Sequence, residues 1–555
     1  MVRATFSGFN TALSALQANQ KRLDITGQNL SNMNTAGYTR QQLEASSLNY
    51  TNPVSHYSNG NETAVGFGVS MDRVSQIRDP YLDIQYRSQS ADCSYTNRLQ
   101  TALNSLSKVL DETTISGIRK AFDDVQSTLT SMQDPAKVSD PIYESELRTK
   151  MQSVCNLFNQ ASRQITQAEQ NEFQRLTGEG SSEQGDVQKI NDILRQIGDL
   201  NVQIKRNQVA GHPSLELQDE RNLLLDELSG YIPVETRYYK DDAHSGNNAY
   251  DYDANGAVIG KKDWPDDLEV SMNYIDAQGK SQKLILVNGS DLGADGLTKN
   301  YGQLSVLKGD HQTAASVSDP ANISIKFEKA PSYQVNGQAA TDVYAELKGI
   351  HFEGGSLQAS LDMLQKKGTG NVINGSVDDV RGYQYYSEKL DQLADTFAKS
   401  MNASNNGNNH KDQNLLSNST DDSTNGITAG NIGISKGWTS GTIHISTDGT
   451  NRTDTILDMI AAMKDTKKLN GKTFADYMNN LSTQLASDSS SNQTALKTGT
   501  TVLNSIQDSR DSLSGVSLDE EATNMMAYVS AYNAASRLMT ALDEVLNTLI
   551  SNTGA

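Results

Sequence analysis

The chain has 555 residues, and 47 Lys and Arg against 67 Asp and Glu give it a net charge of −20. That length exceeds what one hydrophobic core supports, so several domains are expected. The acidic balance argues against nucleic acid or an anionic membrane as a partner. The sequence has no apolar run of about eighteen residues and no signal-peptide pattern, so we expect neither membrane insertion nor general secretion. Export by another route stays open.

Residues 1–40 predict a long helix with one apolar seam. Large apolar side chains recur there on alternating steps of three and four, interrupted only at Gln20 and Gly27. The members of the seam are Phe6, Phe9, Leu13, Leu16, Leu23 and Leu30. Such heptad spacing is typical of a helix that pairs with another helix. The polar segment after it is suited to ending the helix and turning the chain, and it contains Asn29, Asn32, Gly37 and Tyr38.

A connector and then a series of helices follow. Residues 41–78 are rich in Gly, Asn and Ser and contain a possible strand pair, for example at 65–71. Asp79 as N-cap and Pro80 at the first helical position predict a helix start. Further helical patterns, which together predict a bundle of long helices, cover 118–132, 141–176, 187–207 and 215–228.

Near Tyr231 the apolar period drops toward two, which indicates strands. Leu268, Val270 and Met272, for example, alternate with polar neighbours. We therefore expect a β-rich insertion at 234–353. The helical pattern returns after it, and the expected order is helices at 357–364 and 377–402, a loop at 402–428 and a short strand pair at 430–446.

The C-terminal part predicts helices at 455–465, 473–487 and 493–512, and then a final helix with its own seam. The members of this second seam are Met525, Tyr528, Tyr532, Ala535, Met539, Leu542, Leu546 and Leu549. All nine prolines lie between Pro53 and Pro331, so both terminal helices lack this helix breaker. The matching seams predict that the two ends of the chain pair with each other.

The last helix carries more apolar surface than one partner can cover, because Val529, Leu538 and Val545 widen its seam. We therefore hypothesise that both ends are mobile in the monomer and become ordered only between neighbouring subunits.

The predicted fold class is mainly α with a β-rich insertion. We expect a terminal coiled-coil domain made of residues 1–50 with 515–555. A helical bundle domain is expected from 51–233 with 354–514, including the short β element near 430–446. The inserted residues 234–353 are expected to form an outer β domain.

Two cysteines, Cys93 and Cys155, lie within helical patterns. Buried cysteine is a common core residue, which favours plain packing for both. A disulfide between them stays open as an alternative.

Three patterns resemble catalytic or binding sites, and each has a simpler structural interpretation. Residues 433–437 match a nucleophile elbow around Ser435, but no helix start is expected after it. Residues 471–473 resemble the end of a phosphate loop without its upstream glycine, which favours an ordinary helix start. Residues 251–262 have calcium-loop spacing but Lys262 at the last ligand position, which favours a turn. With the seven histidines scattered singly, we expect no enzyme activity, cofactor or metal.

Three segments together resemble the bacterial flagellar axial protein family. They are residues 29–41 with their Gly-Tyr-Thr-Arg-Gln ending, residues 217–228, and residues 514–521. The last segment contains Gly515, Leu518, Asp519, Glu520 and Glu521. The resemblance covers nearly the whole chain outside 235–350.

This resemblance implies a self-assembling structural protein that joins the flagellar hook to the filament, exported by the flagellar type III apparatus. Its implied partners are further copies of itself, the hook protein, hook-associated protein 3 and a flagellar export chaperone. In the family the terminal helices pair in the inner tube of the axial structure, which would place both seams at helix and subunit contacts. The alternatives are another axial protein, such as the hook protein, hook-associated protein 3 or flagellin, or a filament-borne enzyme or adhesin acting through the β insertion.

Overall fold

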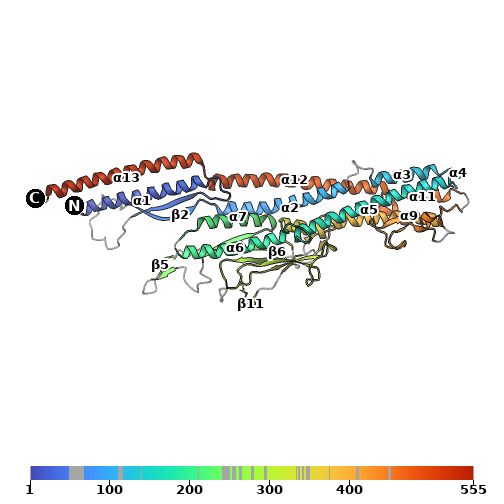
Figure 1. Cartoon of the computed structure of the whole chain (residues 1–555), viewed down its shortest axis with the longest axis horizontal. Helices are drawn as coiled ribbons and strands as arrows, with labels where there is room; N and C mark the ends of the chain where they lie inside the picture. The colour runs from blue at the N-terminus through green and yellow to red at the C-terminus, as the bar shows by residue number, and fades with distance from the viewer. Residues whose placement is uncertain are drawn as a thin grey trace.

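The computed structural model shows an elongated, mostly helical molecule whose two termini lie at the same end (Figure 1). The residues that it describes are 2–48, 68–110, 117–138, 140–210, 212–240, 250–252, 258–261, 266–276, 280–292, 297–332, 334–335, 338–339, 343–345, 351–373, 376–407, 412–447 and 452–553.

The first and last helices lie side by side at the terminal end. Helix α1 (Val2–Ser31) runs antiparallel to helix α13 (Leu518–Thr553), and the Arg22 guanidinium lies 5.6 Å from the centre of the Tyr528 ring (Figure 1). A hairpin of strands β1 (Gln41–Ser47) and β2 (Val69–Gln76) packs along α1. The predicted strand pair is therefore present, although residues 65–67 lie outside the described part of the chain.

Long helices form the bundle that carries this end. They are α2 (Pro80–Leu110), α3 (Ile118–Ser131), α5 (Pro141–Thr177), α9 (Tyr383–Asn406), α11 (Asp454–Lys464) and α12 (Phe474–Ser514), with the single turn α4 (Pro135–Val138) before α5. The predicted cap of α2 is confirmed, because Asp79 accepts a hydrogen bond from the Tyr81 N–H at 2.9 Å. At the core of the bundle, the Phe122 ring lies 5.1 to 5.9 Å from the rings of Phe158, Phe397 and Phe474.

Helices α6 (Asp186–Val209), α7 (Leu215–Tyr231) and α8 (Ser356–Gln365) lie between the bundle and the β insertion. Two three-stranded antiparallel sheets lie on the side of the molecule away from α12 (Figure 1). One is β3 (Glu235–Lys240), β6 (Asp266–Ile275) and β7 (Ser281–Asn288), and the other is β8 (Gln303–Lys308), β9 (Ile323–Glu328) and β12 (Val343–Ala345). Leu268, Val270 and Met272 of β6 are fully buried, as their alternation predicts.

Short strand pairs complete the β structure. They are β4 (Tyr250–Tyr252) with β5 (Val258–Lys261), β10 (Gln334–Val335) with β11 (Gln338–Ala339), β13 (Val372–Ile373) with β14 (Ser376–Val377), and β15 (Leu416–Asn418) with β16 (Ile432–Ile434). The insertion leaves and re-enters the helical part at one place. A Cβ on Gly355, next to α8, would lie 2.4 Å from the carbonyl oxygen of Tyr231, the last residue of α7. Only glycine allows this close approach, and it brings the two ends of the insertion together.

Three local predictions were wrong. The helix expected from residue 377 begins at Tyr383, because Val377 pairs with Val372 in a small hairpin. The strand pair expected at 430–446 is wrong, because this range holds only β16, whose partner β15 lies inside the expected loop. The short helix α10 (Lys436–Ser440) follows β16. The two helices expected at 473–487 and 493–512 are the single helix α12, since contacts with α2 override the weak helix propensity of the serine run between them.

Both cysteines are free and buried, so no disulfide joins them. Cys155 is completely buried in the bundle core, while Cys93 lies where α2 meets α12. The packing interpretation of both residues is therefore supported.

The Phe122 cluster makes the stability of the bundle testable. We expect Phe122→Ala to destabilise the bundle by about 3 to 5 kcal/mol, because it leaves a cavity among four helices. Tyr81→Ala, at an exposed position on α2, is the matched control and should change stability by less than about 0.5 kcal/mol. Urea unfolding followed by circular dichroism measures both, and equal midpoints for the two variants would contradict this packing role.

Candidate functional site where the sequence motifs meet

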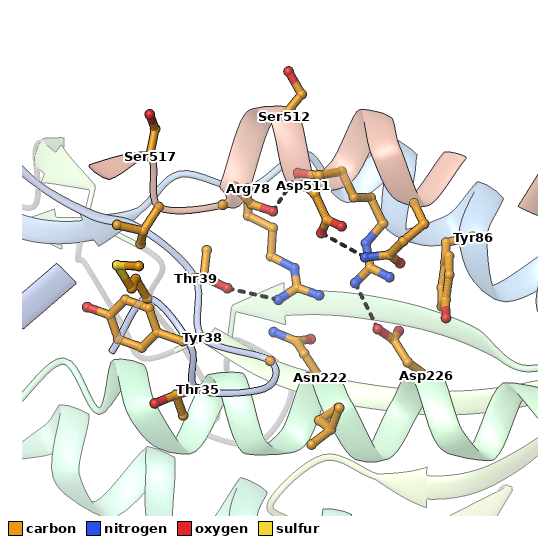
Figure 2. A pocket seen from close by; sticks show the side chains of 18 of the residues that line it. Thr35, Tyr38, Thr39, Arg78, Tyr86, Asn222, Asp226, Asp511, Ser512 and Ser517 are labelled. Carbon is orange, nitrogen blue, oxygen red and sulfur yellow. Dashed lines mark hydrogen bonds and ion pairs between the residues drawn. The ribbon is translucent and has the colours of Figure 1, made fainter. Parts of the chain in front are cut away.

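The three segments singled out in the sequence, 29–41, 217–228 and 514–521, meet where the terminal helices join the bundle. Residues from all three line a cavity of about 810 Å³, together with residues of α2 and the C-terminal end of α12. Figure 2 shows Arg78, Asn222 and Asp226 between α7 and α12, with the chain segment that carries Tyr38 and Thr39 beside them.

Asn29 closes the turn that follows α1. Its side-chain amide donates to the Gln41 carbonyl at 3.0 Å, and its Oδ1 accepts from the Gln41 N–H at 3.0 Å and from the Tyr38 hydroxyl at 2.9 Å. Asn29 is almost completely buried, so these three bonds satisfy a side chain that would otherwise be costly to bury. This amide therefore holds the turn by which the chain leaves α1.

Two further members of the first motif shape the same turn. Asn32 donates to the Gln28 carbonyl at 3.0 Å and accepts from the Thr35 hydroxyl at 3.3 Å. Gly37 has φ = 78°, a conformation that side chains disfavour, and packs against Leu223 of α7. The motif therefore places its glycine where the backbone requires one.

Arg40 ties this turn to the start of α13. Its guanidinium contacts Glu520 at 2.6 Å and the buried Glu521 at 2.7 Å, and its backbone N–H donates to the Ser514 carbonyl at 2.9 Å. Asp519, Glu520 and Glu521 lie in the first turn of α13, where carboxylates also interact favourably with the helix dipole.

Gly515 provides the break between α12 and α13. A Cβ at this position would lie 2.4 Å from the Asp511 carbonyl oxygen. Any larger residue would therefore clash with the last turn of α12 and change where this helix ends. Leu518, the first residue of α13, is largely exposed. The third motif therefore supplies a close turn and an acidic helix start.

Asp219 of α7 is the least satisfied group in the site. Its Oδ2 accepts the Thr39 N–H at 3.1 Å, while its buried Oδ1 has no hydrogen-bond partner and lies 4.0 Å from Arg78 Nη1. Burial raises the pKa of Asp219 to about 6, against the opposing effects of Thr39 and Arg78.

A chain of ion pairs joins three helices beside the cavity. Arg78 contacts Asp83 at 2.5 Å, and Arg510 of α12 contacts Asp83 at 3.0 Å and Asp226 of α7 at 2.8 Å. Arg87 of α2 reaches Asp226 at 2.8 Å, and all five side chains are largely buried. We call these five residues the junction network.

Sequence reasoning missed most of the junction network. Only Asp226 lies within a segment that the sequence singled out. Charged residues on the core-facing side of a predicted helix could have indicated the other network residues. Asp83 and Arg87, four residues apart on α2, are an example.

The terminal seams differ in how they are covered. On α13, Met525, Met539, Leu542 and Leu546 are partly covered, while Tyr532 and Leu549 are exposed. On α1, Phe9, Leu16, Leu23 and Leu30 are half-buried and Leu13 is 47% exposed, while the side chain of Phe6 lies outside the described residues. The most buried side chains of α1 lie outside the predicted seam, and all but Ile25 are smaller or polar: Ala12, Ala18, Asn19, Ile25, Thr26 and Asn29.

Small residues explain part of this pattern. A Cβ on Gly8 would lie 3.4 Å from the methyl groups of Leu542, so α1 and α13 approach closely at this point. Two antiparallel helices and a hairpin leave the large side chains of the α1 seam only half covered.

The enzyme-like patterns take structural roles. A short helix does follow Ser435, contrary to expectation, but Ser435 has an ordinary φ of −61° and caps that helix. Its buried hydroxyl donates to the Asn414 carbonyl at 2.6 Å. Thr473 caps α12, as an ordinary helix start requires. Half of the calcium-like segment, including Lys262, lies outside the described residues.

Within the described part of the chain, no group of three His, Cys, Asp or Glu residues could hold a metal ion. None of its helices combines the length and apolar character needed to cross a membrane.

Family models match three parts of the chain. Residues 9–39 match the flagella basal body rod protein, residues 103–259 the flagellar hook-associated protein FlgK helical domain, and residues 509–552 the flagellar basal body rod FlgEFG protein C-terminal region. These matches, at both ends and in the bundle, define a flagellar axial protein.

Individual relatives narrow the class. The chain is 29% identical over 568 residues to flagellar hook-associated protein 1 of Bacillus subtilis, covering 99% of both chains. It is 28% identical over 229 residues to the Salmonella typhimurium protein of the same name, covering 41% of this chain and 38% of that one. The solved structure of the flagellar hook junction protein FlgK from Burkholderia pseudomallei aligns with a TM-score of 0.38 and 19% identity over 61% of this chain and 45% of that one. The chain is thus similar over nearly its whole length to a hook-associated protein 1, and its residues 103–259 match the helical domain of that flagellar protein.

Asp219 gives the site a pH dependence. The pKa of about 6 lies above the ordinary value of 3.8, so the folded state holds this proton over a pH range in which the unfolded state has lost it. Stability should therefore fall as pH rises from about 4 to 6, by up to roughly 3 kcal/mol from this group. Asp219→Asn should flatten the dependence, measured by urea unfolding at each pH.

The control for this pH dependence is Asp24→Asn, an exposed carboxyl on α1. It should leave the wild-type pH profile of stability in place. If the two variants gave the same profile, Asp219 would not carry the effect.

Gly37 and Gly27 form a matched pair of substitutions. Gly37→Ala should destabilise the terminal end by about 1 to 2 kcal/mol, because alanine is strained at φ = 78°. Gly27→Ala, inside α1 with open space around its Cβ position, should stabilise α1 by about 0.5 to 1 kcal/mol. Hydrogen exchange of the α1 amides measures both, and the same sign for the two substitutions would contradict this assignment.

Proposed function

We propose that this protein is a self-assembling subunit of the junction between the flagellar hook and filament. Its near full-length similarity to a hook-associated protein 1 supports this role over that of another axial protein. The observation that carries the proposal is the apolar surface left uncovered on α13. Met526 is 65% exposed and Val545 57% exposed, and Val529, Leu538 and Ile550 are also exposed.

These exposed side chains lie on both sides of the seam that faces α1. A residue on an α-helix advances about 100° from the one before it, so Val529 lies on one flank and Leu538 and Val545 lie on the other. One antiparallel partner covers the seam and leaves both flanks open. Large exposed apolar patches mark interaction sites, and helices of neighbouring subunits on each side would cover these flanks.

In this proposal α1 and α13 form a coiled coil within the inner wall of the axial structure. The exposed Leu13 and Leu549 and the half-covered Leu16, Leu23, Leu30, Leu542 and Leu546 complete their burial against neighbouring subunits. The ends are mobile in the free monomer and ordered in the assembly. Strong amide protection of α1 and α13 in the soluble monomer would contradict this.

The other regions have separate roles in the assembly. Residues 1–50 with 515–555 form the terminal domain, residues 51–233 with 354–514 form the bundle domain, and residues 234–353 form the outer β domain. The chain leaves the cell through the flagellar type III apparatus with the help of an export chaperone. Its partners are further copies of itself, the hook protein and hook-associated protein 3.

Gene deletion tests the proposed role directly. Electron microscopy should show cells with hooks but no filaments, and the culture medium should contain unassembled flagellin. Normal filaments on the deleted strain would refute the junction role.

A double substitution tests the flanks of α13. Leu538→Glu with Val545→Glu should leave the helix content of the monomer unchanged and fail to restore filaments to the deletion strain, because two charges would be buried between subunits. The matched control is Thr540→Glu with Asn547→Glu, which adds the same charge at exposed polar positions of α13. Restoration by the control alone is the expected result. Restoration by both variants would show that the apolar flanks are not buried in the assembly.

A further inference from the structure

Helix α12 consists of two parts that are held in different ways. In its first part, Phe474, Tyr477, Met478, Leu481 and Leu485 are buried in the bundle core. From residue 486 to 514 none of its residues is fully buried, and one face rests on α2. We call residues 486–514 the strap.

The strap has little tendency to remain helical by itself. Eighteen of its 29 residues are Ser, Thr, Asn, Asp or Gly, all of which favour the helix less than alanine does. A serine run at 489–491 lies next to its start, and Gly499 lies near its middle. Its helical form therefore depends on contact with α2.

The contact with α2 is mainly polar. Asn492 donates to the Thr96 carbonyl and to the Gln100 side chain, both at 2.9 Å, and Gln100 donates to Ser489 at 2.8 Å. Leu496, Leu503 and Ile506 recur at helical spacing on the face that carries Asn492 and Gly499, and all three are only partly buried. Opening this interface costs less than opening the first part of α12, because it exposes little apolar surface.

Charged groups hold the strap at both ends. At its start, the two carboxylate oxygens of Asp488 accept hydrogen bonds from Arg381 Nη1 at 2.6 and 2.8 Å. At its end, Arg510 contacts Asp83 and Asp226 and stacks 4.3 Å from the centre of the Tyr86 ring. Arg510 is the one residue of the strap that reaches both α2 and α7 with its charge.

We propose that the strap opens from α2 as a unit while the bundle stays folded, and that Arg510 is the latch that holds it closed. With the latch open, α13 and the end of α1 can change direction relative to the bundle without unfolding it. The proposal concerns the free subunit and stands whether or not the chain assembles at the hook–filament junction.

Cys93 and Cys155 provide an internal probe of this opening. Cys93 lies beneath the strap, since a Cβ on Gly499 would lie 3.0 Å from its sulfur. Cys155 is completely buried in the bundle core and becomes accessible only when the bundle opens. One reagent therefore reports strap opening at Cys93 and bundle opening at Cys155 in the same molecule.

The test is alkylation of the full-length protein with iodoacetamide at fixed pH, with each cysteine followed by peptide mass spectrometry. In the wild-type protein Cys93 should react at least 100-fold faster than Cys155. Arg510→Ala should speed the reaction of Cys93 at least tenfold and leave the rate at Cys155 unchanged. Arg195→Ala, which removes an exposed arginine paired with Asp192, is the matched control and should change neither rate.

Two results would overturn the proposal. Equal rates at the two cysteines in the wild-type protein would mean that the strap and the bundle open together. An unchanged rate at Cys93 in Arg510→Ala would mean that Arg510 is not the latch.

Hydrogen exchange of the wild-type protein gives a second measurement that needs no variant. Amides at 490–512 should exchange at least 100-fold faster than those at 474–485. Uniform protection along α12 would contradict the strap, even if Arg510→Ala failed to fold.

Discussion

The junction network holds together parts of the chain that are far apart in sequence. Arg510, near the end of the chain, shares Asp83 with Arg78 and shares Asp226 with Arg87. These charges are largely buried, so each of them depends on the others for compensation. Thr39 joins the network through its hydroxyl, which accepts from Arg78, and the direction of the terminal helices thus becomes coupled to α2 and α7.

The three sequence segments that carry the family resemblance meet beside the junction network. Segment 29–41 supplies the turn and Arg40, segment 217–228 supplies Asp219 and Asp226, and segment 514–521 supplies the glycine break and the acidic helix start. Their side chains meet at one place, although the segments are nearly 200 to 300 residues apart in the sequence. The three motifs, although separate in the sequence, therefore form one structural joint.

Much of the helical order could be predicted from the sequence, because apolar spacing and caps are local signals. The start of α2 at Pro80 and the alternation in β6 are examples. The continuity of α12 could not be predicted, because the serine run within it has a low helix propensity. Hydrogen bonds with Thr96 and Gln100 of α2 hold this part of the helix in place. The ion pairs of Arg510 could not be predicted either, because Asp83 and Asp226 come close to Arg510 only after the bundle has formed. Heptad counting selected the large residues of α1, yet Ala12, Ala18 and Asn29 are more buried, since close approach of the backbone favours small side chains.

The close approach of Gly355 to Tyr231 has a consequence for how this chain can vary. The two ends of the β insertion lie against each other, so the insertion is attached to the helical part at a single place. A region of more than one hundred residues could lengthen, shorten or be exchanged without changing the path of the chain on either side. The helical framework can thus stay the same while the outer surface of the molecule changes.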